Sequence, residues 1–339
     1  MSSPKYLGVE LRTSPHLRRK ISTDQIMRNV VYALLPVWAV AVYNFGWSAL
    51  LLSATTLTVC LLSERAACAL SGAENTLSDW SAAITGLLLG LTLPPGFPLW
   101  MAAVGGVAAI AIGKLLFGGL GCNVFNPALV GRAFLQAAFP VAITTWSPAL
   151  FAERFRSLIP TSLTTPLMHP VVDGLSGATP LAAMKFDGVV AETMDLFMGG
   201  VAGSAVETCA VVILLAGAYL AARRMLDWRI PAGIFLTVGV LSGVLHQFLP
   251  RVPAPGFMLF SGGLMLGAVF MATDMVTSPV TSRGIWLYAA LIGVLVVVIR
   301  VWGGLPEGVM YAILLGNAAA PGLDRLNQPR IYGAVRSKA

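Results

Sequence analysis

Ten apolar segments divide this chain, and they constrain its fold more than any other feature. An α-helix needs about 20 apolar residues to cross a bilayer core. Only 11% of the residues are charged and 57% are hydrophobic, whereas a soluble domain carries about 25% charged residues. We therefore expect an all-α polytopic membrane protein of about ten transmembrane helices, with membrane lipid around most of it. The apolar segments are 26–45, 47–63, 81–93, 98–117, 125–139, 198–221, 231–249, 256–273, 284–302 and 307–320.

Two of these segments, 81–93 and 125–139, are short for a bilayer. Pro94 and Pro95 follow the first segment, and Pro127 lies at the start of the second. Proline lacks the amide hydrogen of a helical residue and ends or bends helices. We predict that both segments form half-length or broken helices.

The basic residues lie in short clusters between the apolar segments, although the net charge of the chain is +7. A nucleic-acid-binding protein presents a basic face or stripe instead, so no nucleic-acid partner is expected. Under the positive-inside rule the clusters mark the cytoplasmic side. This orientation places both termini in the cytoplasm and leaves one long loop, 140–197, outside. For a multi-pass protein of a bacterial inner membrane, that loop is periplasmic.

The two halves of the chain share a pattern of glycines and basic residues. The run 86–90 (Gly-Leu-Leu-Leu-Gly) matches 263–267 (Gly-Leu-Met-Leu-Gly). Lys114 and the Gly-Gly pair after it match Arg300 and the Gly-Gly pair after that residue. Five helices in each half would invert the second copy relative to the first. The alternative is chance recurrence of the small residues that close helix packing selects. The predicted parts are a cytoplasmic segment 1–23, a first repeat 24–139, the external loop 140–197, a second repeat 198–322 and a cytoplasmic tail 323–339.

The external loop contains the sequence Asp173-Gly-Leu-Ser176-Gly177-Ala178-Thr179, followed by proline. It matches the pattern Asp-x-x-Ser/Thr-Gly-Ala-Thr and so resembles the target of bacterial flavin transferases. These enzymes join FMN through its phosphate to the threonine hydroxyl. Five fixed positions occur by chance in roughly one chain in a thousand of this length. Small neighbours leave the threonine hydroxyl unobstructed, and glycine permits an adaptable turn. The alternative is a surface turn in which Asp173 serves as a cap.

This motif, together with the segments 86–95, 121–128 and 271–274, resembles the RnfD/NqrB family over about residues 20–322. The absence of a long N-terminal extension favours the RnfD branch. The resemblance implies two inverted five-helix repeats and covalent FMN on Thr179, with Asp173, Ser176, Gly177 and Ala178 around it. It also allows a second, noncovalent flavin such as riboflavin. The implied partners are other Rnf-type subunits and, during maturation, a flavin transferase. Met275 departs from the proline that NqrB-like members carry there.

Two carboxylates are candidates for an ion or proton pathway. Asp274 ends the eighth apolar segment among hydroxyl residues, so it can offer oxygen ligands to a hard cation. It can equally be an interfacial carboxylate at a helix end. Glu207 lies inside the sixth segment, where a charge is costly and marks a functional candidate. It can also be a neutral packing residue whose pKa burial has raised.

Other polar residues have simpler predicted roles. We expect Asp79 and the pair Asn123 and Asn126 to cap helices, and Lys114 and Arg300 to reach the membrane interface from segment ends. The four cysteines and three histidines show no ligand spacing, so no metal site is predicted.

Two functions compete at this point. The first is an electron-carrying subunit of an ion-translocating ferredoxin- or NAD-linked oxidoreductase complex, coupled to Na⁺ or H⁺ movement and not a complete enzyme alone. The second is a non-redox channel or secondary transporter for a small solute, formed by the inverted repeats. A covalent flavin distinguishes them, because only the first requires it.

Overall fold

The described part of the chain is built from helices. The computed structural model describes residues 22–72, 76–166, 177–199, 203–204, 210–249 and 251–328. No β-strand occurs in these ranges, and Trp146 and Gly177 form an isolated antiparallel bridge. The α-helices are α1 (Thr23–Phe45), α2 (Trp47–Ser71), α3 (Ser81–Thr92), α4 (Leu99–Gly113), α5 (Pro127–Ala138), α6 (Pro140–Thr144), α7 (Pro180–Ala182), α8 (Thr193–Met198), α9 (Ala210–Ala222), α10 (Arg229–Phe248), α11 (Pro255–Phe260), α12 (Leu264–Leu266), α13 (Ser282–Trp302) and α14 (Val309–Leu326). The short turns are η1 (Thr76–Asp79), η2 (Leu115–Phe117), η3 (Pro160–Leu163), η4 (Ala183–Asp187) and η5 (Gly267–Met271).

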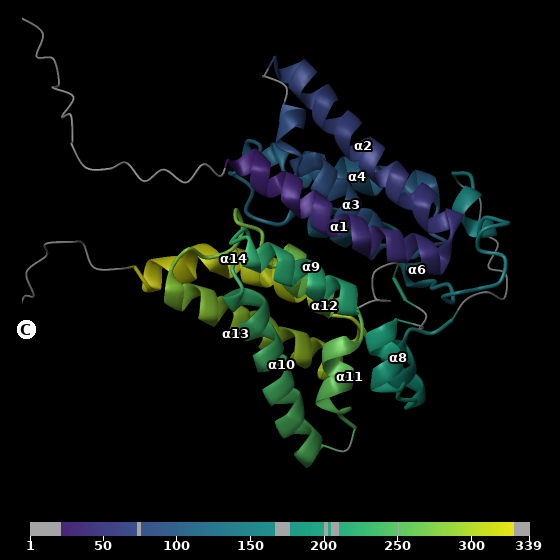
Figure 1. Cartoon of the computed structure of the whole chain (residues 1–339), viewed down its shortest axis with the longest axis vertical. Coiled ribbons are helices and arrows are strands. Elements are labelled where there is room, and N and C mark those ends of the chain that lie inside the picture. Colours follow the sequence, from purple (N-terminus) through teal and green to yellow (C-terminus); the bar gives the residue numbers. More distant parts are fainter. Residues whose placement is uncertain are drawn as a thin grey trace, which may run out of the picture.

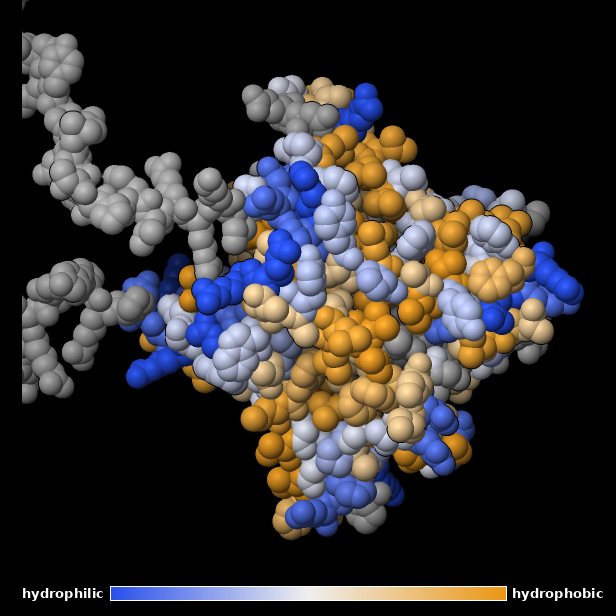
Figure 2. All heavy atoms as spheres, viewed as in Figure 1, coloured by the Kyte–Doolittle hydropathy of each residue, from blue (hydrophilic) through white to orange (hydrophobic). Residues whose placement is uncertain are grey.

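Within these residues, five helical stretches are long and apolar enough to cross a membrane: α1, α2, α4 extended through η2, α10 and α13. α3 and α9 are shorter apolar helices. The prediction of an all-α polytopic membrane protein is thus confirmed. Figure 2 shows apolar residues gathered across the middle of one face, with polar residues at its left and right edges.

The two short predicted segments form short helices, as expected from their prolines. α3 and α5 each have 12 residues. Asn126 caps α5 by accepting hydrogen bonds from the amides of Ala128 and Leu129. Asp79 accepts a hydrogen bond of 2.8 Å from the amide of Ser81, the first residue of α3. The capping role predicted for Asn126 is confirmed. Asp79 lies one residue before the N-cap of α3, which is Trp80. Asn123 donates a hydrogen bond to the carbonyl of Phe125 and does not cap a helix amide.

The eighth predicted segment, 256–273, differs from a single apolar span. It is divided into α11, α12 and the π-helical turn η5. The break falls at Gly262, whose φ of +66° is a conformation that side-chain-bearing residues rarely adopt. Two helical pieces, α11 and the continuous stretch of α12 and η5, therefore replace one long helix. The break between them frees backbone groups in the interior of the molecule.

Helix packing in the second half repeats that of the first. α2 packs on α3 and α4 and α4 on α5, just as α10 packs on α11 and α13 and α13 on α14. The two halves meet where α1 contacts α9 and where α5 contacts α14. In Figure 1 the first half, coloured purple to blue, lies above the second, coloured green to yellow.

The second repeat runs in the opposite direction to the first. Lys114 follows α4 and lines a cavity with Met27 from the start of α1. Arg300, near the end of α13, instead lies beside the 140–197 loop, as shown by the hydrogen bond that Lys185 of this loop donates to its carbonyl. The corresponding ends of α4 and α13 thus lie on opposite sides. The start of α1 and the end of α14 share one side, and α6 and α8 of the 140–197 loop lie at the other (Figure 1).

Candidate functional site

Thr179 lies at the wall of a cavity between the two repeats. α3, α5, α6, η5 and the start of α14 surround this space, which we call the loop-side cavity. Thr179 contributes its side chain from the segment that leads into α7. The lining residues are Thr92, Leu129, Arg132, Gln136, Ile143, Thr144, Trp146, Thr179, Leu181, Ser204, Gly263, Leu266, Gly267, Met271, Leu305, Pro306, Glu307, Val309, Met310 and Tyr311.

The end of the predicted motif is fixed to the wall of this cavity. The amide of Gly177 donates a hydrogen bond of 2.8 Å to the carbonyl of Trp146. Ala178 is exposed, whereas Thr179 is only 7% exposed. The Thr179 hydroxyl accepts a hydrogen bond of 3.2 Å from the amide of Ala182 and so caps α7. The expectation of an unobstructed hydroxyl on an open turn is therefore wrong for this conformation.

Lys185 attaches the segment after Thr179 to the second repeat. Its ammonium group donates hydrogen bonds to the carbonyls of Arg300, Gly303 and Leu305. Partial burial lowers the pKa of Lys185 from its ordinary value, while the three carbonyl acceptors favour the charged form. The lysine thus satisfies carbonyls left free at the end of α13 and holds the Thr179 segment beside the cavity.

Two opposite charges meet in the wall of the loop-side cavity. The Nη2 of Arg132 on α5 lies 3.0 Å from the Oε2 of Glu307, just before α14. The other carboxylate oxygen, Oε1, accepts a hydrogen bond of 2.6 Å from the amide of Gly263. Neither charged residue was singled out from the sequence. A lone arginine within an apolar segment is the signal that would have identified Arg132.

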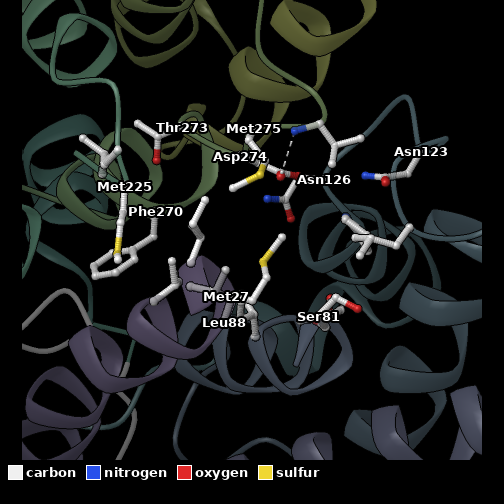
Figure 3. Close-up of a pocket in the computed structure, with 18 of the residues that line it drawn as sticks. Met27, Ser81, Leu88, Asn123, Asn126, Met225, Phe270, Thr273, Asp274 and Met275 are labelled. Carbon is white, nitrogen blue, oxygen red and sulfur yellow. Dashed lines mark hydrogen bonds between the residues drawn. The ribbon is translucent and has the colours of Figure 1, made fainter. Parts of the chain in front are cut away.

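A second cavity lies on the side where α1 begins and α14 ends, and we call it the terminus-side cavity. Its apolar walls include Met27, Leu88 and Phe270, and its polar groups include Lys114, Asn123, Asn126 and Asp274. Figure 3 shows the side chains of Asp274 and Asn126 close together in this space. The amide of Asn126 also donates a hydrogen bond of 3.3 Å to the carbonyl of Met271 and so joins the two repeats.

Asp274 stabilises the turn that follows the broken eighth segment. Its carboxylate accepts hydrogen bonds of 3.3 Å from the amide of Val276 and 3.5 Å from the hydroxyl of Thr277. The side chain is partly exposed and lines the terminus-side cavity. This geometry is compatible with both predicted roles, cation ligand and interfacial carboxylate, so each stays a prediction.

Lys114 and Arg300 do not extend to the membrane interface, and that prediction is wrong. They are 2% and 1% exposed. The Lys114 ammonium binds Glu64 at 2.6 Å and Ser81 at 2.5 Å. The Arg300 guanidinium donates to the carbonyls of Met258 at 2.6 Å and Ser261 at 2.9 Å. Each cation has found partners inside its own repeat, because buried charges are stable only when paired.

Three of the predicted site residues, Asp173, Ser176 and Glu207, lie outside the described residues. The histidine within a span, His246, contacts the carbonyl of Val252 through Nδ1 at 2.6 Å. Over the ranges that the structure describes, no group of three metal-ligating side chains occurs.

Comparison with known proteins places this chain in one family over nearly its whole length. Residues 10–333 match the NQR2, RnfD, RnfE family. The chain is 44% identical, over 92% of each sequence, to the D subunit of the ion-translocating oxidoreductase complex of Stutzerimonas stutzeri. It is 41% identical, over 98% of each, to the D subunit of the Na⁺-translocating ferredoxin:NAD⁺ oxidoreductase complex of Acetobacterium woodii. The proton-translocating counterpart of Clostridium ljungdahlii is 38% identical over 96% of each. The chain therefore belongs to the NQR2, RnfD, RnfE family, within which these relatives are D subunits of ion-translocating oxidoreductase complexes.

Proposed function

We propose that this chain is an electron-carrying membrane subunit of an ion-translocating ferredoxin:NAD⁺ oxidoreductase complex, with FMN bound covalently to Thr179. The observation that carries the proposal is the position of Thr179. It ends a specific flavinylation motif, and its side chain lines a cavity between the two repeats. The names of three relatives, each covering most of the chain, support the same role.

The residues of the loop-side cavity fit a flavin in their chemistry. Leu129, Ile143 and Met310 supply apolar walls, and Trp146 supplies an aromatic ring. Polar groups at a few places can hold the ring edges, as in most cofactor sites. Arg132 adds a positive charge that suits a phosphorylated cofactor. When bound, the flavin would supply the redox chemistry, and the chain would supply its position and electrostatic surroundings.

Attachment forms one phosphoester bond. The Thr179 hydroxyl loses its proton, and its oxygen bonds to the phosphorus of the flavin phosphate. A flavin dinucleotide is a suitable donor, because its nucleoside monophosphate leaves with the cleaved bond. Since Thr179 is 7% exposed, the flavin transferase must act on this segment while it is displaced from the cavity wall. The exposed position of Ala178 beside it is compatible with such a displacement.

The terminus-side cavity is the place for a second, noncovalent flavin such as riboflavin. Asn123, Asn126 and Lys114 provide hydrogen-bonding groups there, and Phe270 and Leu88 provide apolar walls. The two cavities then hold one flavin towards each side of the membrane. Asp274 borders the second cavity, which makes it a candidate for the Na⁺ or H⁺ pathway, as Glu207 is by its place in the sixth segment.

The proposed setting is a bacterial inner membrane, with both termini cytoplasmic and the Thr179 loop periplasmic. The basic clusters support this orientation. Other Rnf-type subunits complete the electron path.

In-gel fluorescence tests the proposal. Denaturing electrophoresis of the purified complex removes noncovalent flavin, so a fluorescent band at this subunit requires a covalent one. We expect fluorescence in the wild type and in Thr144→Val, which removes another hydroxyl from the same cavity, but not in Thr179→Val. A dark wild-type band from a host with a flavin transferase would favour a non-redox channel or transporter. Noncovalent flavin released from the Thr179→Val complex reports the second site.

A further inference from the structure

The ion pair between Arg132 and Glu307 joins the two repeats at the wall of the loop-side cavity. The two residues are 175 positions apart in the sequence. Arg132 is 8% exposed. Within the part of the chain that the structure describes, its side chain donates one hydrogen bond, to Glu307, whereas a guanidinium carries five N–H donors. Donor capacity therefore remains on a side chain that lines the loop-side cavity.

Both partners are held in position by close backbone packing. Gly131, beside Arg132, lies so near α4 that an added Cβ would be 2.7 Å from the Cβ of Ala109. At Gly263 an added Cβ would be 2.8 Å from the Oε1 of Glu307. Glycine at these two positions lets α5 approach α4 and lets the carboxylate reach the amide of Gly263. The guanidinium is thus fixed from two sides before any ligand arrives.

This ion pair is only partly buried, with 9% of the Arg132 side chain and 20% of the Glu307 side chain exposed, and it gives the structure little net stability. Replacing such a pair by apolar residues is often neutral or stabilising, because desolvation offsets the attraction. Charged residues within membrane segments are costly and mark functional sites. Stability therefore does not explain why the chain contains this ion pair. Its position in the wall of the loop-side cavity indicates that it acts on a molecule bound in the cavity.

Arg132 and Glu307 are, among the described residues that line the loop-side cavity, the two that are charged at neutral pH. A flavin becomes more negative when it accepts electrons without an equal number of protons. A fixed guanidinium favours that reduced form, and the attraction is stronger in surroundings of low dielectric constant. Arginine suits the task because it stays protonated at all physiological pH values.

We propose that Arg132 faces the flavin carried by Thr179 and raises its reduction potential, and that Glu307 is a positioning residue that fixes the guanidinium and moderates its charge. This inference rests on the proposed function, because it needs the covalent flavin. The phosphate is an alternative target for Arg132. Its charge does not change on reduction, so pairing with phosphate would affect attachment of the flavin and not its potential.

The test is a reductive titration of the purified complex with dithionite as the electron donor. The midpoint potential of the covalent flavin is measured for the wild type, Arg132→Gln, Arg132→Lys and Glu307→Gln. Arg156→Gln is the matched control, because it also replaces an arginine by glutamine, but at an exposed position that does not line the cavity. In-gel fluorescence of each protein reports attachment separately.

We expect Arg132→Gln to keep its fluorescent band and to lower the ratio of reduced to oxidised flavin about tenfold at a fixed potential, which is about 59 mV for a one-electron couple. Arg132→Lys should shift less, and Arg156→Gln should not shift. Glu307→Gln should shift the potential in the opposite direction, because it removes the counter-charge and keeps an oxygen acceptor. If the pair were only structural, Arg132→Gln and Glu307→Gln would shift the flavin potential in the same direction.

Three results would overturn the inference. They are an unchanged potential in a fluorescent Arg132→Gln protein, shifts of the same sign in Arg132→Gln and Glu307→Gln, and loss of the flavin from Arg132→Gln, which would assign the guanidinium to the phosphate. Should Arg132→Gln fail to accumulate, the sign of the Glu307→Gln shift decides. A fluorescent wild type with no shifts removes this inference alone, whereas a dark wild type removes the proposed function as well.

Discussion

The Lys114 ammonium lies 2.6 Å from the Oε1 of Glu64, and both side chains are almost fully buried. The hydroxyl of Thr76 donates to the same oxygen at 2.5 Å. The pair ties the end of α4 to α2 beside the terminus-side cavity, which Lys114 also lines. Lys114 thus neutralises the buried Glu64 carboxylate and also forms part of the wall of that cavity.

Removing one partner of this pair should destabilise the protein strongly. Lys114→Met leaves the carboxylate of Glu64 buried without its counter-charge, which costs about 3–5 kcal/mol. The double variant Lys114→Met/Glu64→Leu should recover most of the loss, because no charge remains buried. Thermal unfolding of the purified complex in detergent measures both effects. A double variant no more stable than Lys114→Met alone would contradict this role of the pair.

The positions of the membrane segments could be predicted from the sequence, because the apolar residues form continuous runs bounded by proline and basic residues. Local capping could be predicted for the same reason. Asp79 and Asn126 bind amides only two or three residues ahead of them. The break at Gly262 was missed, because an apolar run of normal length gives no sign of its backbone conformation.

The long-range charge pairs could not be predicted from the sequence. Glu64 is 50 residues from Lys114, and it lies on a helix that continues to Ser71, past the predicted end of the segment at 63. Arg132 and Glu307 come from different repeats. Their pairing depends on how α5 and α14 meet, and neither sequence segment contains that information.

The orientation across the membrane can be tested with a reporter that is active only in the cytoplasm. Fusions after Arg224 or at Ala339 should be active, because the basic clusters place these positions inside. Insertion at Gly188 should be silent. This glycine lies in an exposed turn with open space around it, so an insertion there is compatible with the fold. Activity at Gly188 would reverse the orientation and place the Thr179 segment in the cytoplasm.

Asp274→Asn tests the ion pathway. Asparagine keeps the size of the side chain but removes its charge. It also keeps an oxygen that can accept the hydrogen bond from the Val276 amide, which is 3.3 Å long with aspartate. If Asp274 binds the coupling cation, ion-linked turnover should fall while the covalent flavin remains. Ion uptake into membrane vesicles and in-gel fluorescence measure the two quantities. Unchanged ion dependence would assign Asp274 to the turn alone.

The central claim concerns the hydroxyl of Thr179, and two variants separate its chemistry from its structural role. Thr179→Val removes both the hydroxyl and the cap of α7, so it should cost about 1 kcal/mol of stability, more than an ordinary surface substitution. Thr179→Asn keeps a capping oxygen but has no hydroxyl to esterify. Both variants should insert into the membrane, lack the covalent flavin and stop electron transfer, whereas Thr164→Val should behave as the wild type.

Mass mapping of the peptide that contains Thr179 tests the claim most directly. The wild-type protein is digested, and the mass and fragmentation of the peptide locate any modification. We expect an added group equal to FMN less one water on Thr179, and an unmodified peptide from Thr179→Asn. An unmodified wild-type peptide, or a flavin on another residue, would contradict the claim.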